Sequence, residues 1–483
     1  MRISIPRYLV YAVILIVICL VFFVPIFPSV DGAAHLYNSL IFKDLFMDLP
    51  SAYNKVFTYN KIIVPNWFDH IFIAGLSFLF SALLAQKIFV VITIVSFTHA
   101  YFKVGSGNDI LTLLILPFIF SFFLITGLYN QTWSFIVFLY FLSFLDRNNF
   151  KVKREFKFWL IIFVYAMLFW ITSVLGYGLF LVLLGITLFN QKKLSKVIRD
   201  AVITVFLISP SFILTIYFVA NTSMSNGEPV IGVFSRIINL LLLDSLKFSG
   251  MGGEPIFLGI VSISVIILLV LVLRNNKNVG LYVLIGCVLL LFAIATPNHV
   301  GAGMLSNRLA FYFWLFVLFF IKKFSSNVKL NSWFSAIVLI CFVLTMNKRY
   351  NTHFEKYGEL SKEIYDIGIG IETGKSVWSV NYSDEWFVGH SLNYACIPNK
   401  AIAIDNYEAN YAWFPIRWRN EYRFLGQQYK NLWVAHSLTN FTNVSTDYIL
   451  TYGTIPKPVK EELLKSYYVI DRNERLILLA KKD

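Results

Sequence analysis

The sequence has little charge and few cysteines for its length. Asp, Glu, Lys and Arg together make up 14% of its 483 residues, whereas soluble proteins carry about 25%. It has four cysteines, and no CxxC or His/Cys pairing that would predict a zinc motif. GxGxxG, P-loop, GxSxG and HExxH motifs are also absent at a convincing spacing. These absences argue against a soluble fold, a disulfide framework, nucleotide binding and serine or zinc hydrolysis.

Apolar residues are abundant instead. Hydrophobic residues make up 58% of the chain and aromatic residues 18%, and the mean hydropathy is +0.68. A water-soluble fold cannot hide so much apolar surface, so we expect a polytopic α-helical membrane protein. The net charge of +14 lies in short loops between apolar runs, as the positive-inside rule expects. We therefore expect membrane lipids as partners and no nucleic acid.

The distribution of Lys and Arg predicts the orientation of the chain. Basic loops at 146–157, 191–199, 274–277 and 322–329 are expected to be cytoplasmic, together with the N-terminus. The first apolar run is long for a signal sequence and is read as a retained helix. We predict about eleven spans in the inner membrane: 8–28, 88–102, 110–126, 131–146, 157–173, 176–190, 200–219, 255–273, 279–295, 308–322 and 331–346.

One segment resists this count. Residues 67–83 are apolar enough to cross, but their entry is polar and aromatic, with Asn66, Trp67 and Asp69. Such an entry is typical of an interfacial helix, so we predict that 67–83 lies on the membrane. Counting it as a span would give four crossings in this region, and that alternative stays open.

The predicted domains follow from this topology. Residues 1–346 form a transmembrane domain with a long first outer loop at 29–86, and 347–483 form an extracytoplasmic α/β domain. Helices are expected at 354–368 and 456–466. Strands are expected at 377–381, 401–405, 448–452, 467–470 and 475–480.

Asp31 and His35 follow the first span, one helical turn apart. A carboxylate beside an imidazole at the membrane boundary can deprotonate a hydroxyl or hold a divalent cation. The alternative is an Asp that only caps a helix. Asp31 and His35 are the predicted catalytic pair, and Asp31 is a candidate metal ligand.

A second group of polar residues lies at other outer ends of the spans. Arg308 enters an apolar helix, and its forked donors suit a phosphate, although it can also be an arginine that extends to the interface. Arg236 is a weaker candidate in the apolar stretch 231–248. The residues predicted to bind substrate or donor near such ends are Arg308, Asn307, His299, Tyr129 and Asn130.

A third group is the stretch 405–415, in which Asp405 and Glu408 stand among aromatic residues. Acids and rings of this kind can bind a sugar, so both residues are predicted to bind substrate. The alternative is docking of the domain through its aromatic residues. His70, His99, His353 and His390 stand alone in the sequence and are predicted to be structural.

Together these features resemble the GT-C superfamily of membrane glycosyltransferases, which includes protein mannosyltransferases and aminoarabinose transferases. The resemblance rests on Asp31 after the first helix, the first outer loop at 32–83, the many spans and the terminal outer domain. It implies inverting transfer of a sugar from a polyprenyl phosphate to a glycan, lipid or protein acceptor. By analogy, Asp31 would be the general base or a metal ligand, and Arg308 would meet the donor phosphate.

The chain also departs from the family pattern. Gly32 replaces the second of two adjacent acids found in many members, and Val64-Pro65-Asn66-Trp67 replaces a His-Pro-Pro entry. A transporter or lipid flippase, and a non-catalytic protein of envelope biogenesis, remain alternatives. No internal repeat favours the transporter. The sequence identifies no cofactor beyond the divalent cation.

Overall fold

The computed structural model describes residues 5–105, 109–191, 193–221, 232–248, 254–297, 304–325, 332–428 and 446–482. The chain divides into two compact units. The first comprises Met1–Leu20, Val91–Ile125 and Tyr129–Thr352, and the second comprises Val21–Val90, Thr126–Leu128 and His353–Asp483. The helices α1 (Ile5–Phe23) and α5 (Ala82–Phe102) contribute residues to both units.

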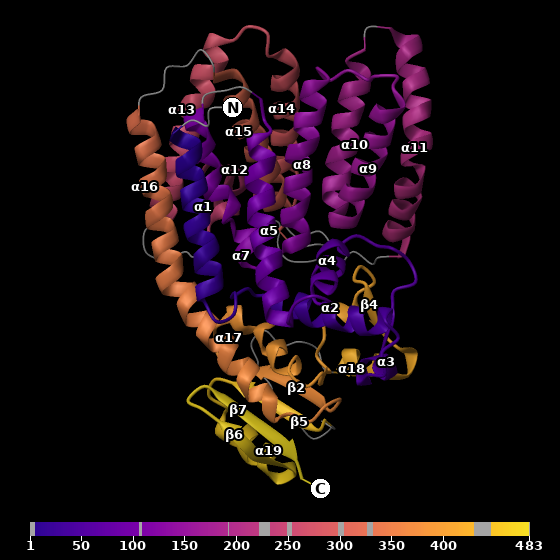
Figure 1. Ribbon diagram of the computed structural model, residues 1–483, viewed down its shortest axis with the longest axis vertical. Helices are drawn as coiled ribbons and strands as arrows, with labels where there is room; N and C mark the ends of the chain where they lie inside the picture. The colour runs from indigo at the N-terminus through magenta and orange to yellow at the C-terminus, as the bar shows by residue number, and fades with distance from the viewer. Residues whose placement is uncertain are drawn as a thin grey trace. The chain divides into compact units, whose positions relative to one another are not determined.

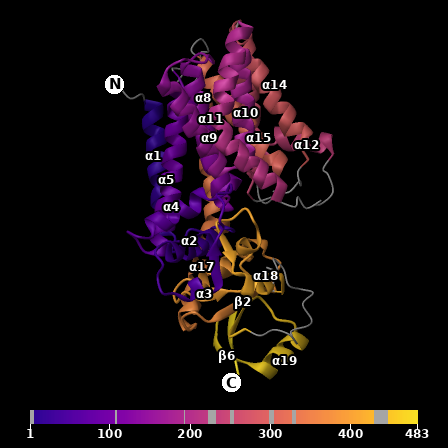
Figure 2. The same cartoon turned by 90° about the vertical axis from the view of Figure 1, so that its right-hand side faces the viewer.

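The first unit is helical throughout its described residues (Figure 1). The helices α9, α10 and α11 lie side by side in Figures 1 and 2. Most of α15 is enclosed by neighbours, whereas α11 exposes apolar residues such as Val205 and Phe206. From Tyr129 on, the helices of this unit are α8 (Tyr129–Arg147), α9 (Phe156–Thr172), α10 (Val174–Phe189), α11 (Leu194–Asn221), α12 (Val233–Leu241), α13 (Glu254–Asn275), α14 (Gly280–Ala295), α15 (Leu305–Phe324) and α16 (Ser332–Arg349).

Four helices in the described residues are long and apolar enough to cross a membrane, namely α5, α11, α13 and α15. Five further apolar helical segments are shorter, at Tyr8–Phe23, Leu111–Ile125, Phe156–Thr172, Val174–Phe189 and Gly280–Ala295. The count of about eleven crossings therefore stays a prediction.

Three segments differ from the sequence prediction. The expected single span at 110–126 is divided into η1 (Asp109–Ile115), α6 (Leu116–Ile119) and α7 (Phe122–Ile125), because Phe120 leaves the helical conformation with φ −95° and ψ 46°. α16 continues three residues past the predicted 346, so Lys348 and Arg349 lie in its last turn. Between 231 and 248 the helix α12 covers only nine residues and is followed by η2 (Asp244–Leu246).

The second unit begins with the segments between the first two long helices. α2 (Gly32–Phe46) packs on α4 (Phe68–Leu76), and between them lie α3 (Ala52–Val56) and β1 (Phe57–Tyr59). α4 has nine residues and is therefore about 14 Å long, well short of a hydrocarbon core of about 30 Å. The next helix, α5, starts at Ala82, six residues before the predicted span.

The rest of the second unit is an α/β fold. A five-stranded sheet has the order β3-β2-β5-β7-β6, in which β2 runs parallel to β3 and β5 while β7 is antiparallel to β5 and β6. Its strands are β2 (Ser376–Asn381), β3 (Ile402–Ala403), β5 (Tyr448–Tyr452), β6 (Tyr467–Arg472) and β7 (Leu476–Lys481), and its helices are α17 (Glu355–Ile367), α18 (Arg423–Gln428) and α19 (Lys457–Ser466). The predicted strands and both predicted helices are found close to their expected bounds.

Shorter elements complete this unit. β4 (Ile416–Trp418) pairs antiparallel with β1, with Phe57 opposite Trp418. Short helical turns lie at η4 (Tyr350–Phe354), η5 (Gly368–Gly370), η6 (Trp386–Val388), η7 (Ser391–Cys396), η8 (Glu408–Asn410) and η9 (Asn420–Tyr422). The β1–β4 pair joins the segment between α3 and α4 to the segment after η8.

Candidate active site

Asp31 occupies the N-cap position of α2, but its side chain makes no capping hydrogen bond. Its backbone N–H donates to the Thr126 carbonyl at 2.9 Å, and its own carbonyl accepts the His35 N–H at 2.9 Å. The Asp31 side chain is 17% exposed. The Asp31 carboxylate is therefore partly exposed and does not serve as the cap of α2.

Gly127 fixes the backbone beside Asp31. It has φ +86°, and a Cβ there would lie 2.6 Å from Gly32 N and 3.1 Å from the Asp31 carbonyl carbon. Glycine is the residue that adopts this φ without strain and allows so close an approach. The backbone of Gly127 therefore lies directly against the start of α2.

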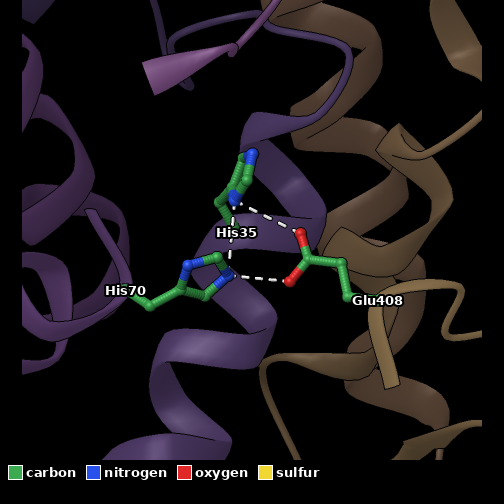
Figure 3. A group of neighbouring side chains, drawn as sticks. All are labelled: His35, His70 and Glu408. Carbon is green, nitrogen blue, oxygen red and sulfur yellow. Dashed lines mark hydrogen bonds and ion pairs between the residues drawn. The ribbon is translucent and has the colours of Figure 1, made fainter. Parts of the chain in front are cut away.

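His35 faces a buried cluster made by three separate segments of the second unit (Figure 3). Its Nδ1 lies 3.3 Å from His70 Nε2, 3.2 Å from Glu408 Oε1 and 3.1 Å from Asp69 Oδ2. His70 Nε2 contacts Glu408 Oε2 at 2.7 Å, and His70 Nδ1 lies 2.8 Å from Asp69 Oδ1. All four side chains are at least nine-tenths buried. We call these four residues the His–carboxylate cluster.

Two histidines of this region have opposite electrostatic surroundings. Burial alone would lower the pKa of His70, but the carboxylates of Asp69 and Glu408 outweigh it and raise that pKa to about 10. Burial, followed by the neighbouring His35, lowers the pKa of His390 to about 3. His390 is therefore a neutral imidazole at ordinary pH, whereas His70 retains a proton unless another cation replaces it.

His390 and Tyr407 connect Asp31 with the His–carboxylate cluster. His390 Nε2 lies 3.6 Å from Asp31 Oδ1, and the His390 ring packs on the Tyr407 ring with centroids 4.2 Å apart. The Tyr407 hydroxyl donates to Glu408 Oε1 at 3.4 Å. Burial, then the charges of Asp31 and Glu408, keep the pKa of Tyr407 well above its usual value, so the phenol stays protonated.

The segment that carries Glu408 is held against α2 by amide and phenol contacts. Asn38 and Asn406 exchange two side-chain hydrogen bonds of 3.1 and 2.7 Å. The Tyr37 hydroxyl donates to the Ala401 carbonyl at 2.9 Å and accepts from the Ala403 N–H at 3.0 Å. Because these bonds are buried, they fix Glu408 relative to His35 more firmly than exposed contacts would.

Asp405 is buried in the same unit but makes none of the hydrogen bonds described above. It is 1% exposed, its neighbours include Cys396 and Tyr37, and burial raises its pKa to about 7. Its Oδ1 has no hydrogen-bond partner among the described residues. This is the environment of a core carboxyl group, so the sugar-binding role predicted from the sequence stays a prediction.

The remaining predicted residues belong to the first unit. Tyr129 and Asn130 are buried at the start of α8, and Asn307 and Arg308 lie in the first turn of α15. Gln131 and Ser134 of α8 both bond the Tyr312 hydroxyl, one turn after Arg308, and Ser173 donates to Gln131. The N-terminal ends of α8, α10 and α15 therefore meet. His299 lies outside the described residues.

Sequence reasoning missed the partners of His35. His70 and His390 were expected to be structural because they stand alone in the sequence, yet they lie beside His35 and Asp31. The one local signal was the pair Asp69-His70 at the start of a helix within the outer loop. Nothing in the spacing linked that pair to Glu408, which is 338 positions away from His70.

Comparisons with known proteins extend the resemblance noted from the sequence. No family model and no curated protein matches this chain. Two crystal structures of ArnT from Cupriavidus metallidurans do match. The one bound to undecaprenyl phosphate shares 11% identity with a TM-score of 0.50, and the apo structure shares 10% with a TM-score of 0.52. Each alignment covers 99% of this chain and 98% of the other. The chain thus has the fold of ArnT, a GT-C aminoarabinose transferase, and is a multi-pass membrane protein of that fold.

Proposed function

We propose that this protein transfers a sugar from a polyprenyl-phosphate donor to an acceptor on the extracytoplasmic side. The observation that carries the proposal is the Asp31 carboxylate, which makes no capping bond and stands beside an ionisable cluster in a chain with the ArnT fold. One ArnT structure is bound to undecaprenyl phosphate, and a donor of the same chemical class is proposed for this chain.

In this proposal Asp31 is the general base. Its carboxylate takes the proton of an acceptor hydroxyl or amine as the acceptor atom attacks the anomeric carbon. The bond from that carbon to the phosphate oxygen breaks, and the polyprenyl phosphate leaves with the electron pair. A single displacement of this kind inverts the anomeric configuration. The neutral His390 imidazole beside Asp31 is a positioning residue, because it leaves the negative charge on the base.

Arg308 is the proposed ligand of the donor phosphate. It lies at the end of the first unit where the N-termini of α8, α10 and α15 meet. The partial positive charge of helix N-termini favours an anion, and a guanidinium binds phosphate through two parallel hydrogen bonds.

The test is sugar transfer by purified protein in liposomes that contain a panel of polyprenyl-phosphate sugars. Asp31→Asn removes the basic charge and keeps the size of the side chain, so turnover should fall about 10²–10⁴-fold. Asp48→Asn is a matched control, because Asp48 is an exposed acid in the same outer loop. Equal turnover by Asp31→Asn and wild type would remove Asp31 from catalysis. Absence of turnover by wild type with every donor would favour the non-catalytic alternative.

A further inference from the structure

His35, His70 and Glu408 bring three potential metal-ligand atoms together within 4.8 Å (Figure 3). They come from α2, α4 and η8, so the arrangement exists only in the folded unit. Two imidazole nitrogens and one carboxylate are a common ligand set for zinc in proteins. We propose that the His–carboxylate cluster binds one divalent transition-metal ion, with His35 Nδ1, His70 Nε2 and a Glu408 oxygen as ligands.

The spacing of the ligand atoms fits a tetrahedral ion. Bonds of about 2.0–2.1 Å to zinc place neighbouring ligand atoms about 3.3–3.4 Å apart. His35 Nδ1 lies 3.3 Å from His70 Nε2 and 3.2 Å from Glu408 Oε1. The third pair, His70 Nε2 and Glu408 Oε2, lies at 2.7 Å and would have to open by a few tenths of an ångström, which a small rotation of the Glu408 side chain allows.

Asp69 supplies the outer contact that such sites require. A histidine that binds a metal through one nitrogen usually donates its other N–H to a carboxylate, which fixes the tautomer. His70 Nδ1 lies 2.8 Å from Asp69 Oδ1 on the side of the ring opposite Glu408. The other oxygen, Asp69 Oδ2, is 3.1 Å from His35 Nδ1, so Asp69 contacts both histidines, and the fourth position of the ion goes to water.

Charge and ligand chemistry identify the class of ion. The carboxylates of Asp69 and Glu408 carry two negative charges in a buried place, and a divalent ion between neutral imidazoles balances them. Mg²⁺ and Ca²⁺ prefer oxygen ligands, whereas two imidazoles favour Zn²⁺ and its neighbours in the first transition row.

A metal ion at this cluster would also join α2, α4 and η8, which are distant from one another in the sequence. His35 is one turn from Asp31, and Glu408 follows the Asn38–Asn406 contact. A metal ion there would hold the start of α2 to α4 and η8 and thereby stabilise the backbone around Asp31. Metal binding requires no sugar donor, so the metal content can be measured whether or not the protein transfers a sugar.

Metal content of the full-length protein tests the proposal directly. Protein purified in detergent with a tag that lacks histidine, loaded with Zn²⁺ and freed of excess metal, should hold about one zinc per chain. His70→Asn and Glu408→Gln should lose it. Asp69→Asn should weaken the affinity about 10–100-fold, because it alters only the outer contact. His99→Asn is the matched control, since His99 bonds Tyr140 within the first unit and is none of the proposed ligands, so this variant should retain the metal.

Two further measurements use the wild-type protein and therefore do not depend on whether a variant folds. Co²⁺ substitution should give the visible absorption bands of a tetrahedral cobalt site. Chelation with EDTA should lower the melting temperature, and added Zn²⁺ should restore it. The proposal would be overturned if the wild-type protein binds no zinc, shows no tetrahedral Co²⁺ spectrum and has the same melting temperature with and without EDTA. The cluster would then be a protonated His70 held between two carboxylates.

Discussion

Arg349 and Glu254 form an ion pair in which the two side chains are only 2% and 1% exposed. Arg349 Nε donates to Glu254 Oε1 at 2.9 Å, and its other nitrogens donate to the carbonyls of Phe120 and Leu246. The pair joins the last turn of α16 to the first residue of α13. Arg349 follows the predicted span 331–346 on the side predicted to be extracytoplasmic, and this pair neutralises its charge.

Loss of one partner of this pair should destabilise the first unit. Arg349→Met leaves Glu254 buried without its counter-ion, which typically costs about 3–5 kcal/mol. The melting temperature of the detergent-solubilised protein should fall clearly. Lys348→Met is the control, because it removes the same charge from a half-buried neighbour and should change stability little. Arg349→Met combined with Glu254→Leu should recover most of the loss, and a double variant as unstable as the single one would contradict this account.

The orientation of the chain can be tested at two exposed lysines. A cysteine at Lys465, in α19 of the second unit, should react with an impermeant thiol reagent added to intact cells. A cysteine at Lys153, in a loop predicted to be cytoplasmic, should react only after the membrane is permeabilised. The wild-type protein, with its four native cysteines, measures the background. Labelling of Lys153→Cys in intact cells would reverse the predicted orientation.

Gly127 offers a test of how Asp31 is positioned. Gly127→Ala puts a Cβ 2.6 Å from Gly32 N in a backbone conformation that alanine rarely adopts, so the start of α2 must shift. Sugar transfer should fall more than tenfold, because a displacement of about 1 Å at a reacting group can cost about 10²-fold. Gly75→Ala in α4 is the matched control, since its added Cβ meets nothing within 4 Å. Unchanged transfer by Gly127→Ala would show that the exact place of Asp31 is unimportant.

The sequence predicted elements with strong local signals. Residues 448–452 are β-branched, aliphatic or aromatic, and they form β5 with the predicted bounds. β1 and β4 were not predicted, because each has three residues and its partner lies in a distant part of the chain. The break at Phe120 was also missed, since a continuous apolar run carries no sign of where its helix ends.

The candidate site was predictable only in part. Asp31 and His35 were found because they lie one turn apart after the first span. The contact of His35 with His70 and Glu408 depends on how α2 packs against α4 and η8, and no sequence spacing encodes that packing. The zinc-type cluster therefore escaped the motif search, which recognises ligands that are close in sequence.

Arg308 gives a test of donor binding. Arg308→Lys keeps the charge but loses the two-pronged hydrogen bonding of the guanidinium. Loss of one charge-assisted phosphate contact should cost about 1.5–3 kcal/mol, or roughly 10- to 150-fold in donor affinity. Arg236→Lys is the control, because Arg236 donates to the Thr296 carbonyl at 2.8 Å and should affect stability rather than donor binding. If Arg308→Ala binds a polyprenyl-phosphate sugar as wild type does, Arg308 is only an interfacial anchor.

Asp405 should make the stability of the protein depend on pH. Burial raises the pKa of its carboxyl group from 3.8 to about 7 in the folded state, so the fold favours the protonated acid. The stability contributed by this group is therefore complete below about pH 4, declines as the pH rises toward 7, and is lost above it. One pKa unit corresponds to about 1.4 kcal/mol, which sets an upper bound of about 4 kcal/mol on the total change. Asp405→Asn cannot ionise, so it should match wild type near pH 4 and melt at a higher temperature at pH 8.

Asp447 provides a control of opposite sign for this experiment. Burial alone would raise the pKa of Asp447, but hydrogen bonds from Ser376 and the charge of Lys375 outweigh it and lower that pKa. Its contribution to stability is present at neutral pH and is lost as the pH falls through the folded pKa. Asp447→Asn should therefore lower the melting temperature at pH 7 and have less effect in acid. Melting temperatures measured from pH 2 to pH 8 separate the two cases, because Asp405→Asn should diverge from wild type as the pH rises above 4 and Asp447→Asn should converge on it as the pH falls below 4. A melting curve of Asp405→Asn that parallels wild type over this whole range would mean that Asp405 ionises normally and is not a buried neutral acid.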